Sequence, residues 1–206
     1  MISAILVGIN VIAFVVLELL PRDIFAWLYG AGAMYWPAVM ESGQYYRLLT
    51  SMFLHADSTH LVNNMLILFL IGSRLEKVVG KVRFLVVYFL SGILAGVVSM
   101  GYNMWQERLV LAVGASGAVF GLVGALVWVV IAHRGRVQDL TVRQMMLFTA
   151  LSLYGGFADY QTDNAAHLGG LVVGFLLMML LYRRGRYTRN SAPSVEFSAS
   201  SQPPCS

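Results

Sequence analysis

Residues 164–182 read NAAHLGGLVVGFLLMMLLY, and this stretch decides the class of the fold. It contains no Lys, Arg, Asp or Glu, and its length suits a bilayer core about 30 Å thick, which a helix of roughly 20 residues crosses. An imidazole stands near its start, at His167, where it must find a partner or water. The stretch therefore predicts a transmembrane helix with a polar group at one end.

The composition of the whole chain agrees with a membrane protein. Of 206 residues, 58% are hydrophobic and only 12% are charged, whereas soluble domains average about 45–50% apolar and about 25% charged residues. This excess of apolar residues excludes collagen, disordered chains and nucleic-acid-binding modules, in spite of the net charge of +4. The single cysteine, Cys205, excludes a disulfide scaffold.

Six apolar segments predict an all-α polytopic membrane protein with six transmembrane helices. They cover residues 4–20, 60–71, 84–100, 114–132, 144–154 and 164–182. The first segment has no basic residue before it and five spans after it, so we expect a retained anchor and not a cleaved signal peptide. Residues 1–182 then form one membrane domain. Residues 183–206, basic at first and then rich in Ser and Pro, form a tail that we expect to be disordered.

The basic residues predict the orientation of these segments. Eleven of the fourteen Lys and Arg lie between segments two and three, between segments four and five, or after segment six. Because cytoplasmic loops carry the excess of Lys and Arg, both termini are expected in the cytoplasm. Segments two, four and six then all begin near the outer leaflet. Polar residues gather at these three ends, which indicates a site that opens to the periplasmic or extracellular side.

Ser116 lies early in the fourth segment, in the sequence Gly114-Ala115-Ser116-Gly117. Small residues at this spacing let helices pack closely, and a serine hydroxyl often bonds its own backbone, so helix packing alone explains the motif. The alternative is a nucleophile flanked by glycines that allow a substrate backbone to approach.

His167 shares one face of the sixth segment with Gly170 and Gly174. This face predicts close packing against the small face of the fourth segment, which contains Gly117 and Gly121. Such packing carries His167 toward Ser116. A base within hydrogen-bonding reach of a hydroxyl converts a weak nucleophile into an effective one.

Three further polar residues have a structural and a chemical interpretation. His60 and Asn64 stack on one face of the second segment, either as a packing hydrogen bond or as donors to a developing oxyanion. Asp163 precedes His167 by four residues, and capping of the sixth helix is favoured over orientation of the imidazole. For Glu76 we expect a basic partner that ties down the loop after segment two. A metal site is weakly supported, and there is no phosphate-binding loop or dinucleotide fingerprint.

In this order, His60-x-x-x-Asn64, Gly114-Ala115-Ser116-Gly117 and Ala166-His167-x-x-Gly170-x-x-x-Gly174 resemble the motifs of the rhomboid family of intramembrane serine proteases. Tyr46-Arg47 and Gly72-x-x-x-Glu76-x-x-x-Gly80 are similar to two further signatures of that family. The resemblance covers about residues 1–182.

The resemblance implies a Ser–His dyad without an acidic third member. Ser116 is then the nucleophile and His167 the base, while His60, Asn64 and the amide of Ser116 stabilise the oxyanion. It also implies that Gly117, Gly121, Gly170 and Gly174 support helix packing. Substrates of the family are transmembrane proteins, cut near the outer face of the membrane without a cofactor.

Two positions depart from the best-known bacterial branch of the family. Tyr46 stands where that branch has Trp, and Phe120 stands where it has Tyr, so a ring that supports His167 is kept but its hydroxyl is lost. The sequence also leaves two other functions open. One is a catalytically inactive relative that binds membrane clients, and the other is a small transporter, since intramembrane His, Asn and Asp also line ion paths. A bacterial inner membrane is the expected location.

Overall fold

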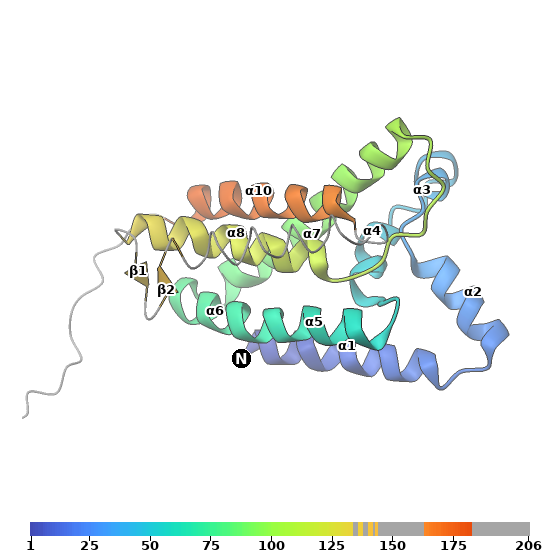
Figure 1. Ribbon diagram of the computed structural model, residues 1–206, viewed down its shortest axis with the longest axis horizontal. Helices are drawn as coiled ribbons and strands as arrows, with labels where there is room; N and C mark the ends of the chain where they lie inside the picture. Colours follow the sequence, from blue (N-terminus) through green and yellow to red (C-terminus); the bar gives the residue numbers. More distant parts are fainter. Residues whose placement is uncertain (134–135, 138–139, 142, 144–162, 183–206) are drawn as a thin grey trace, which may run out of the picture.

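A computed structural model shows an elongated helical bundle (Figure 1). The structure describes residues 1–133, 136–137, 140–141, 143 and 163–182. Five apolar stretches form its long helices: α1 (Ile2–Glu18), the run of α5 (Ser58–Ile67), η2 (Leu68–Gly72) and α6 (Ser73–Val79), then α7 (Lys81–Trp105), α8 (Ser116–Ala132) and α10 (Asn164–Leu181). Between α1 and α5 lie the short helices α2 (Arg22–Gly32), α3 (Trp36–Ser42), α4 (Arg47–Thr50) and η1 (Ser51–Phe53).

The expected all-α class is confirmed, with one small addition after α8. The strands β1 (Arg136–Val137) and β2 (Leu140–Thr141) pair as a two-stranded antiparallel ribbon, with Arg136 opposite Thr141. The ribbon lies at the end of the bundle away from α2 and α3 (Figure 1).

The count of six spans stays a prediction. Among the described residues, two helices, α7 and α10, are long and apolar enough to cross a membrane, and α1 and α8 are apolar helices of 17 residues. The fifth expected segment, residues 144–154, and the tail, residues 183–206, lie outside the described residues. Segment four was placed two residues too early, because Gly114 has a φ of +127° and α8 begins only at Ser116.

The second segment is longer than its expected range of 60–71. It runs without a break from Ser58 to Val79 through the five-residue π-helix η2. We expected a basic partner for Glu76, and the structure shows an anchor at the start of α1. The Glu76 carboxylate lies on α6 and accepts hydrogen bonds from the amides of Ile2 and Ser3, at 2.8 and 2.9 Å, and from the Ser3 hydroxyl at 2.9 Å. Glu76 thus supplies acceptors to free amides at the start of α1, as a capping carboxylate does.

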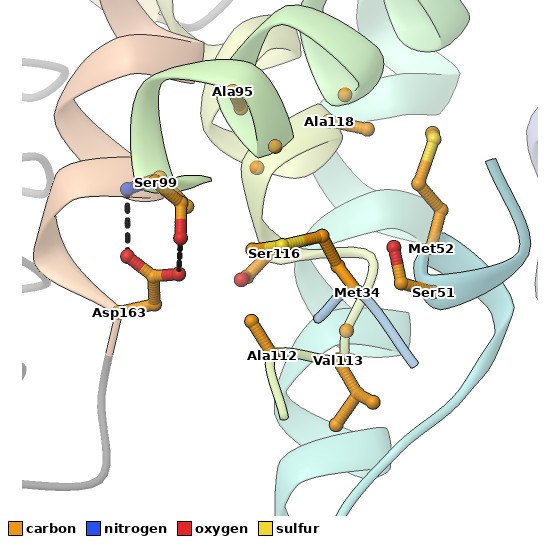
Figure 2. A pocket seen from close by; sticks show the side chains of 15 residues that line it. Met34, Ser51, Met52, Ala95, Ser99, Ala112, Val113, Ser116, Ala118 and Asp163 are labelled. Carbon is orange, nitrogen blue, oxygen red and sulfur yellow. Dashed lines mark hydrogen bonds between the residues drawn. The ribbon is translucent and has the colours of Figure 1, made fainter. Parts of the chain in front are cut away.

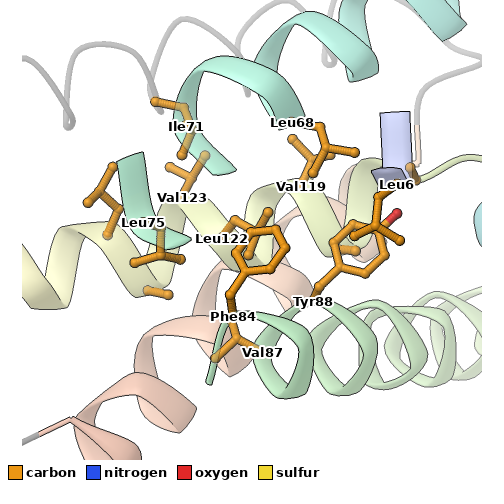
Figure 3. Packing of buried hydrophobic residues seen from close by; sticks show 14 of the residues in the cluster. Leu6, Leu68, Ile71, Leu75, Phe84, Val87, Tyr88, Val119, Leu122 and Val123 are labelled. Atoms are coloured by element: carbon orange, nitrogen blue, oxygen red, sulfur yellow. The ribbon is translucent and has the colours of Figure 1, made fainter. Parts of the chain in front are cut away.

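The core forms where α8 is enclosed by other helices. Leu68 and Leu75 from the second helical run meet Phe84 and Tyr88 of α7 and Leu122 of α8, and all five side chains are fully buried (Figure 3). A helix that is hydrophobic on all sides belongs at the centre of a bundle, and α8 has this character. It packs against α10 and α7 along its length.

Glycines set the distance between these helices. A Cβ placed on Gly170 would overlap the carbonyl oxygen of Gly117, and one placed on Gly174 would overlap that of Gly121. On the other side of α8, a Cβ on Gly121 would also overlap Ser91 of α7. The backbones of α8 and α10 therefore lie in direct contact, which only residues without a side chain permit.

The opposite face of α10 points away from the bundle and is apolar. Leu168, Val172, Leu176 and Leu180 recur every four residues and are each about half or more exposed, whereas Gly170, Gly174 and Met178 are buried. A helix of a water-soluble protein buries its large apolar residues, whereas α10 buries glycines and exposes large apolar residues. This pattern is expected of a helix whose outer face contacts lipid.

The helices α5, α8 and α10 all begin at the same end of the bundle. This end lies opposite the chain's N-terminus and the β ribbon, and next to α4 (Figure 1). The sequence predicted that the polar N-terminal ends of these three helices lie in one layer, and the structure brings them to the same end of the bundle.

We expect Gly174→Ala to destabilise the bundle by about 1–3 kcal/mol, because the added methyl group must push α10 off the backbone of α8. Thermal unfolding in detergent micelles measures this effect. The matched control is Gly101→Ala in α7, where a Cβ would meet no atom within 4 Å and helix propensity rises. Equal unfolding midpoints for the two variants would contradict the direct contact of the helices.

Candidate active site

Gly114 shapes the approach to Ser116. Its amide donates to the carbonyl of Ser51 at 2.9 Å, and its φ of +127° is a conformation that other residues rarely adopt. A Cβ at this position would lie 2.8 Å from Cε1 and 2.9 Å from Nε2 of His60, and 3.7 Å from the Ser116 hydroxyl oxygen. The His60 ring and Ser116 therefore converge on one glycine. Ser116 is the first residue of α8, and the first amides of a helix have no carbonyl acceptor within that helix.

The first turns of α5 position His60 and Asn64. Asp57 caps this helix, with its Oδ1 accepting from the amide of His60 at 2.8 Å. One turn later Asn64 is 5% exposed, and its side-chain nitrogen finds no hydrogen-bond partner within the described part of the chain. Neighbouring Asn63 faces outward. A buried amide donor without a hydrogen-bond partner is costly, so the side-chain nitrogen of Asn64 is a donor that a ligand could satisfy.

His167 is held by an aromatic ring. Phe120, one turn after Ser116 on α8, stacks on the imidazole with a centroid distance of 4.3 Å and an interplanar angle of 15°. His167 is 9% exposed, and its Nδ1 has no hydrogen-bond acceptor or donor among the described residues. Stacking and helix packing thus determine the plane of the ring.

The predicted capping role of Asp163 is confirmed. Its Oδ1 accepts from the amide of Ala166 at 2.9 Å at the start of α10, while Oδ2 accepts a short hydrogen bond from the Ser99 hydroxyl of α7 (Figure 2). Both carboxylate oxygens are therefore engaged with groups other than the Nδ1 of His167.

A small cavity of about 40 Å³ lies beside Ser116. Its polar lining comes from Ser51, Ser99, Ser116 and Asp163, and its apolar lining includes Met34 and Met52 (Figure 2). Because one water needs roughly 10–15 Å³ of such space, the cavity has room for about three water molecules. Hydroxyl and carboxylate groups on its wall give such waters hydrogen-bond partners.

Arg47 organises the first loop next to this cavity. It is 8% exposed, and its guanidinium donates to the carbonyls of Gly30 and Ala33 at 2.6 and 2.8 Å. Just after these carbonyls, Met34 pairs with Ala112 through two backbone hydrogen bonds of 2.9 Å. The residues that precede Ser116 are thereby fastened to the first loop.

Sequence reasoning did not assign functions to Ser99, Ser51 or His55. The polarity of Ser99 within an apolar span was a usable signal, but its partner Asp163 lies 64 residues away. The ring of His55 lies edge-on against that of His60, with ring centroids 5.3 Å apart. It is 4% exposed, and neither of its nitrogens has a partner among the residues that the structure describes.

His55 lies in the connection before α5. Burial, and after it the charge of nearby His60, lower the pKa of His55 from 6.5 to about 4. Between these two values the unfolded chain takes up a proton that the folded chain does not, so stability is lost as the pH falls through this window.

We therefore expect the thermal midpoint of the protein to fall by about 5 °C between pH 6.5 and pH 4 through His55 alone. The variant His55→Leu keeps the volume and removes this titration, so its midpoint should depend less on pH. Differential scanning measurements in one detergent compare the two proteins. Parallel curves for wild type and variant would argue against a buried neutral His55.

The arrangement offers a hydroxyl at a helix start, an imidazole on the adjacent helix and potential donors on a third. Within the described ranges, no three His, Cys, Asp or Glu side chains gather in a way that would hold a metal ion. The chemistry available to these residues is nucleophilic attack assisted by a base.

Comparison with known proteins adds independent information. A family model described as the rhomboid domain matches residues 42–184. Rhomboid protease GluP of Bacillus subtilis (strain 168) is 33% identical over 138 residues, which are 67% of this chain and 26% of GluP. RHOMBOID-like protein 5 of Arabidopsis thaliana is 36% identical over 151 residues, which are 72% of this chain and 48% of that protein.

The Bacillus subtilis protein YdcA is similar over most of its length. It is 34% identical over 145 residues, which are 70% of this chain and 71% of YdcA. By contrast, the chain spans only about a quarter of GluP and about half of RHOMBOID-like protein 5.

Proposed function

Because this chain belongs to the rhomboid family and is thus an integral membrane protein, we propose that it is an intramembrane serine endopeptidase that cleaves membrane-anchored proteins. The observation that carries this proposal is the contact between the first turns of α8 and α10. Gly117 and Gly170 bring the two backbones together, and Phe120 of α8 stacks on His167 of α10.

In the proposed reaction, the Ser116 hydroxyl attacks the scissile carbonyl while His167 accepts its proton. His167 then donates this proton to the leaving amine, which leaves an acyl-enzyme on Ser116. A water molecule attacks the ester with His167 again acting as base, and the acid product departs. The cavity beside Ser116 is a source of that water.

Three donors are proposed to stabilise the negative oxygen that forms during each attack. They are the amide of Ser116, the side chain of Asn64 and the ring of His60. The side-chain nitrogen of Asn64, which has no hydrogen-bond partner among the described residues, and the approach of His60 to Gly114 support this assignment. Donors aimed at the developing charge act strongly in a site that excludes most water, and the loss of one typically reduces the rate by about 10²–10³.

The proposed location is a bacterial inner membrane, with both termini in the cytoplasm and the site near the outer face. The distribution of Lys and Arg supports this orientation. Substrates would be transmembrane proteins that enter the site from the bilayer. No cofactor is required for the proposed chemistry.

Two other functions make different demands on the same residues. A transporter needs polar groups along a path through the membrane, whereas the buried side chains of α8 between Gly117 and Val130 are all apolar. A client-binding relative without activity needs no reactive serine. The reactivity of Ser116 therefore separates the protease from both alternatives.

We expect a fluorophosphonate probe to label the purified protein in detergent, with loss of labelling in Ser116→Ala and His167→Ala. Ser91→Ala is the matched control, because among the described residues the Ser91 hydroxyl bonds only to carbonyls of its own helix α7. Gel fluorescence measures the labelling, and cleavage of a transmembrane test substrate measures turnover. Labelling that survives in Ser116→Ala would remove the serine protease assignment.

Activity should also fall in acid, because His167 must be neutral to accept the proton of Ser116. We expect kcat/KM for a transmembrane substrate to drop about tenfold per pH unit below the titration midpoint of the site. The profile is measured from about pH 8 down to the lowest pH at which the protein stays folded, with a check of folding at each point. A flat profile over a folded protein contradicts the role of His167 as base.

A further inference from the structure

A polar cluster joins α7 to the first turn of α10. Asp163 uses Oδ1 to cap α10 through the amide of Ala166, and Oδ2 to accept from the Ser99 hydroxyl of α7 (Figure 2). One turn along α7, the side chain of Asn103 donates to the Ser99 oxygen at 3.3 Å. A carboxylate that could cap its own helix alone is thus also bonded to a second helix.

Ser99 and Asn103 are buried in a largely apolar helix. Ser99 is 1% exposed and Asn103 is 7% exposed. Polar groups at such depth are costly unless they are bonded, so their bonds to each other and to Asp163 strongly favour one arrangement. Beside them, a Cβ on Gly169 would lie 2.9 Å from Val98 Cβ, so α10 also packs sterically against α7 at this point.

His167 depends on this turn of α10 for its position. Its amide donates to the carbonyl of Asp163 at 3.1 Å, so the capping residue and the imidazole belong to the same turn. The Nδ1 of the ring has no hydrogen-bond partner among the described residues, and the stacked ring of Phe120 restrains only its plane. The distance from the imidazole to Ser116 therefore depends on the position of the first turn of α10.

We propose that Ser99, Asp163 and Asn103 form a clamp between α7 and α10 that positions His167 for reaction with Ser116. This inference rests on the proposed function. The three are positioning residues, which act through the backbone of α10 and not through contact with the scissile bond. The clamp replaces the orienting hydrogen bond that a third residue would give to the histidine ring.

Removal of the α7 side of the clamp tests the proposal. We expect Ser99→Ala to lower kcat by about 10–100-fold with KM within about twofold, because a small displacement of a catalytic group costs this much while substrate contacts remain. Ser91→Ala is the matched control, since it removes a buried hydroxyl of the same helix whose hydrogen bonds, within the described part of the chain, go to carbonyls of α7 itself. It should keep kcat within about twofold of wild type.

Two variants of Asp163 separate geometry from charge. Asp163→Asn still caps α10 and can donate to the Ser99 oxygen, so we expect it to keep kcat within about threefold. Asp163→Ala loses both bonds and should lose about as much activity as Ser99→Ala. Because the clamp acts on one position, the double variant Ser99→Ala with Asp163→Ala should be little worse than either single variant.

All variants are compared by kcat and KM on one transmembrane substrate and by thermal midpoint. A wild-type kcat in folded Ser99→Ala overturns the clamp, as does a loss in Asp163→Asn as large as that in Asp163→Ala. A rise in KM at constant kcat also overturns it, because these residues would then contact the substrate. If Ser99→Ala does not fold, Ser99→Cys takes its place with the same outcomes.

Failure of the clamp is distinguishable from failure of the proposed function. Wild-type protein that neither reacts with the fluorophosphonate probe nor cleaves substrate removes the protease. Labelling and cleavage that depend on Ser116 and His167 but not on Ser99 or Asp163 remove only the clamp.

Discussion

The direct contact between the backbones of α8 and α10 is the constraint on which the rest of the structure depends. Gly117 and Gly121 face Gly170 and Gly174, and no side chain fits between the two helices. Lipid provides no hydrophobic force to bring helices together, so close packing must supply the attraction. This contact also fixes the relative height of the two helix starts. Ser116 comes one residue before Gly117, and His167 comes three residues before Gly170. The contact therefore also fixes the positions of these two residues relative to each other.

Much of this arrangement was predictable, because it depends on local pattern. The long uncharged stretches of sequence located apolar helices such as α7 and α10. The common direction of three segments placed His60, Ser116 and His167 at one end. The four-residue spacing of glycines indicated which faces meet. The capping role of Asp163 followed from its place before an apolar helix. Each of these inferences uses neighbours along the chain or the periodicity of a helix.

The features that sequence reasoning missed all join residues distant along the chain. Glu76 bonds to the amides of Ile2 and Ser3, more than 70 residues away, and local charges suggested a basic partner instead. Ser99 meets Asp163 only because α7 packs against α10. The second helical run continues through a π-helix to Val79. The sequence did not predict this extension, because the charged residues Arg74, Glu76 and Lys77 are typical of a loop. Tertiary contacts decide these points, and no local pattern reports them.

The outward stripe of α10 implies two different rules for substitution on one helix. At Gly170 and Gly174, where α10 touches the backbone of α8, size decides, since any side chain larger than hydrogen forces the helices apart whatever its chemistry. The other face carries Leu168, Val172, Leu176 and Leu180. There the polarity of a side chain decides whether it is tolerated, since an apolar side chain of almost any shape suits the surrounding acyl chains. Natural variants should therefore change side-chain volume freely on the lipid-facing side of α10 and almost never at the glycines that face α8.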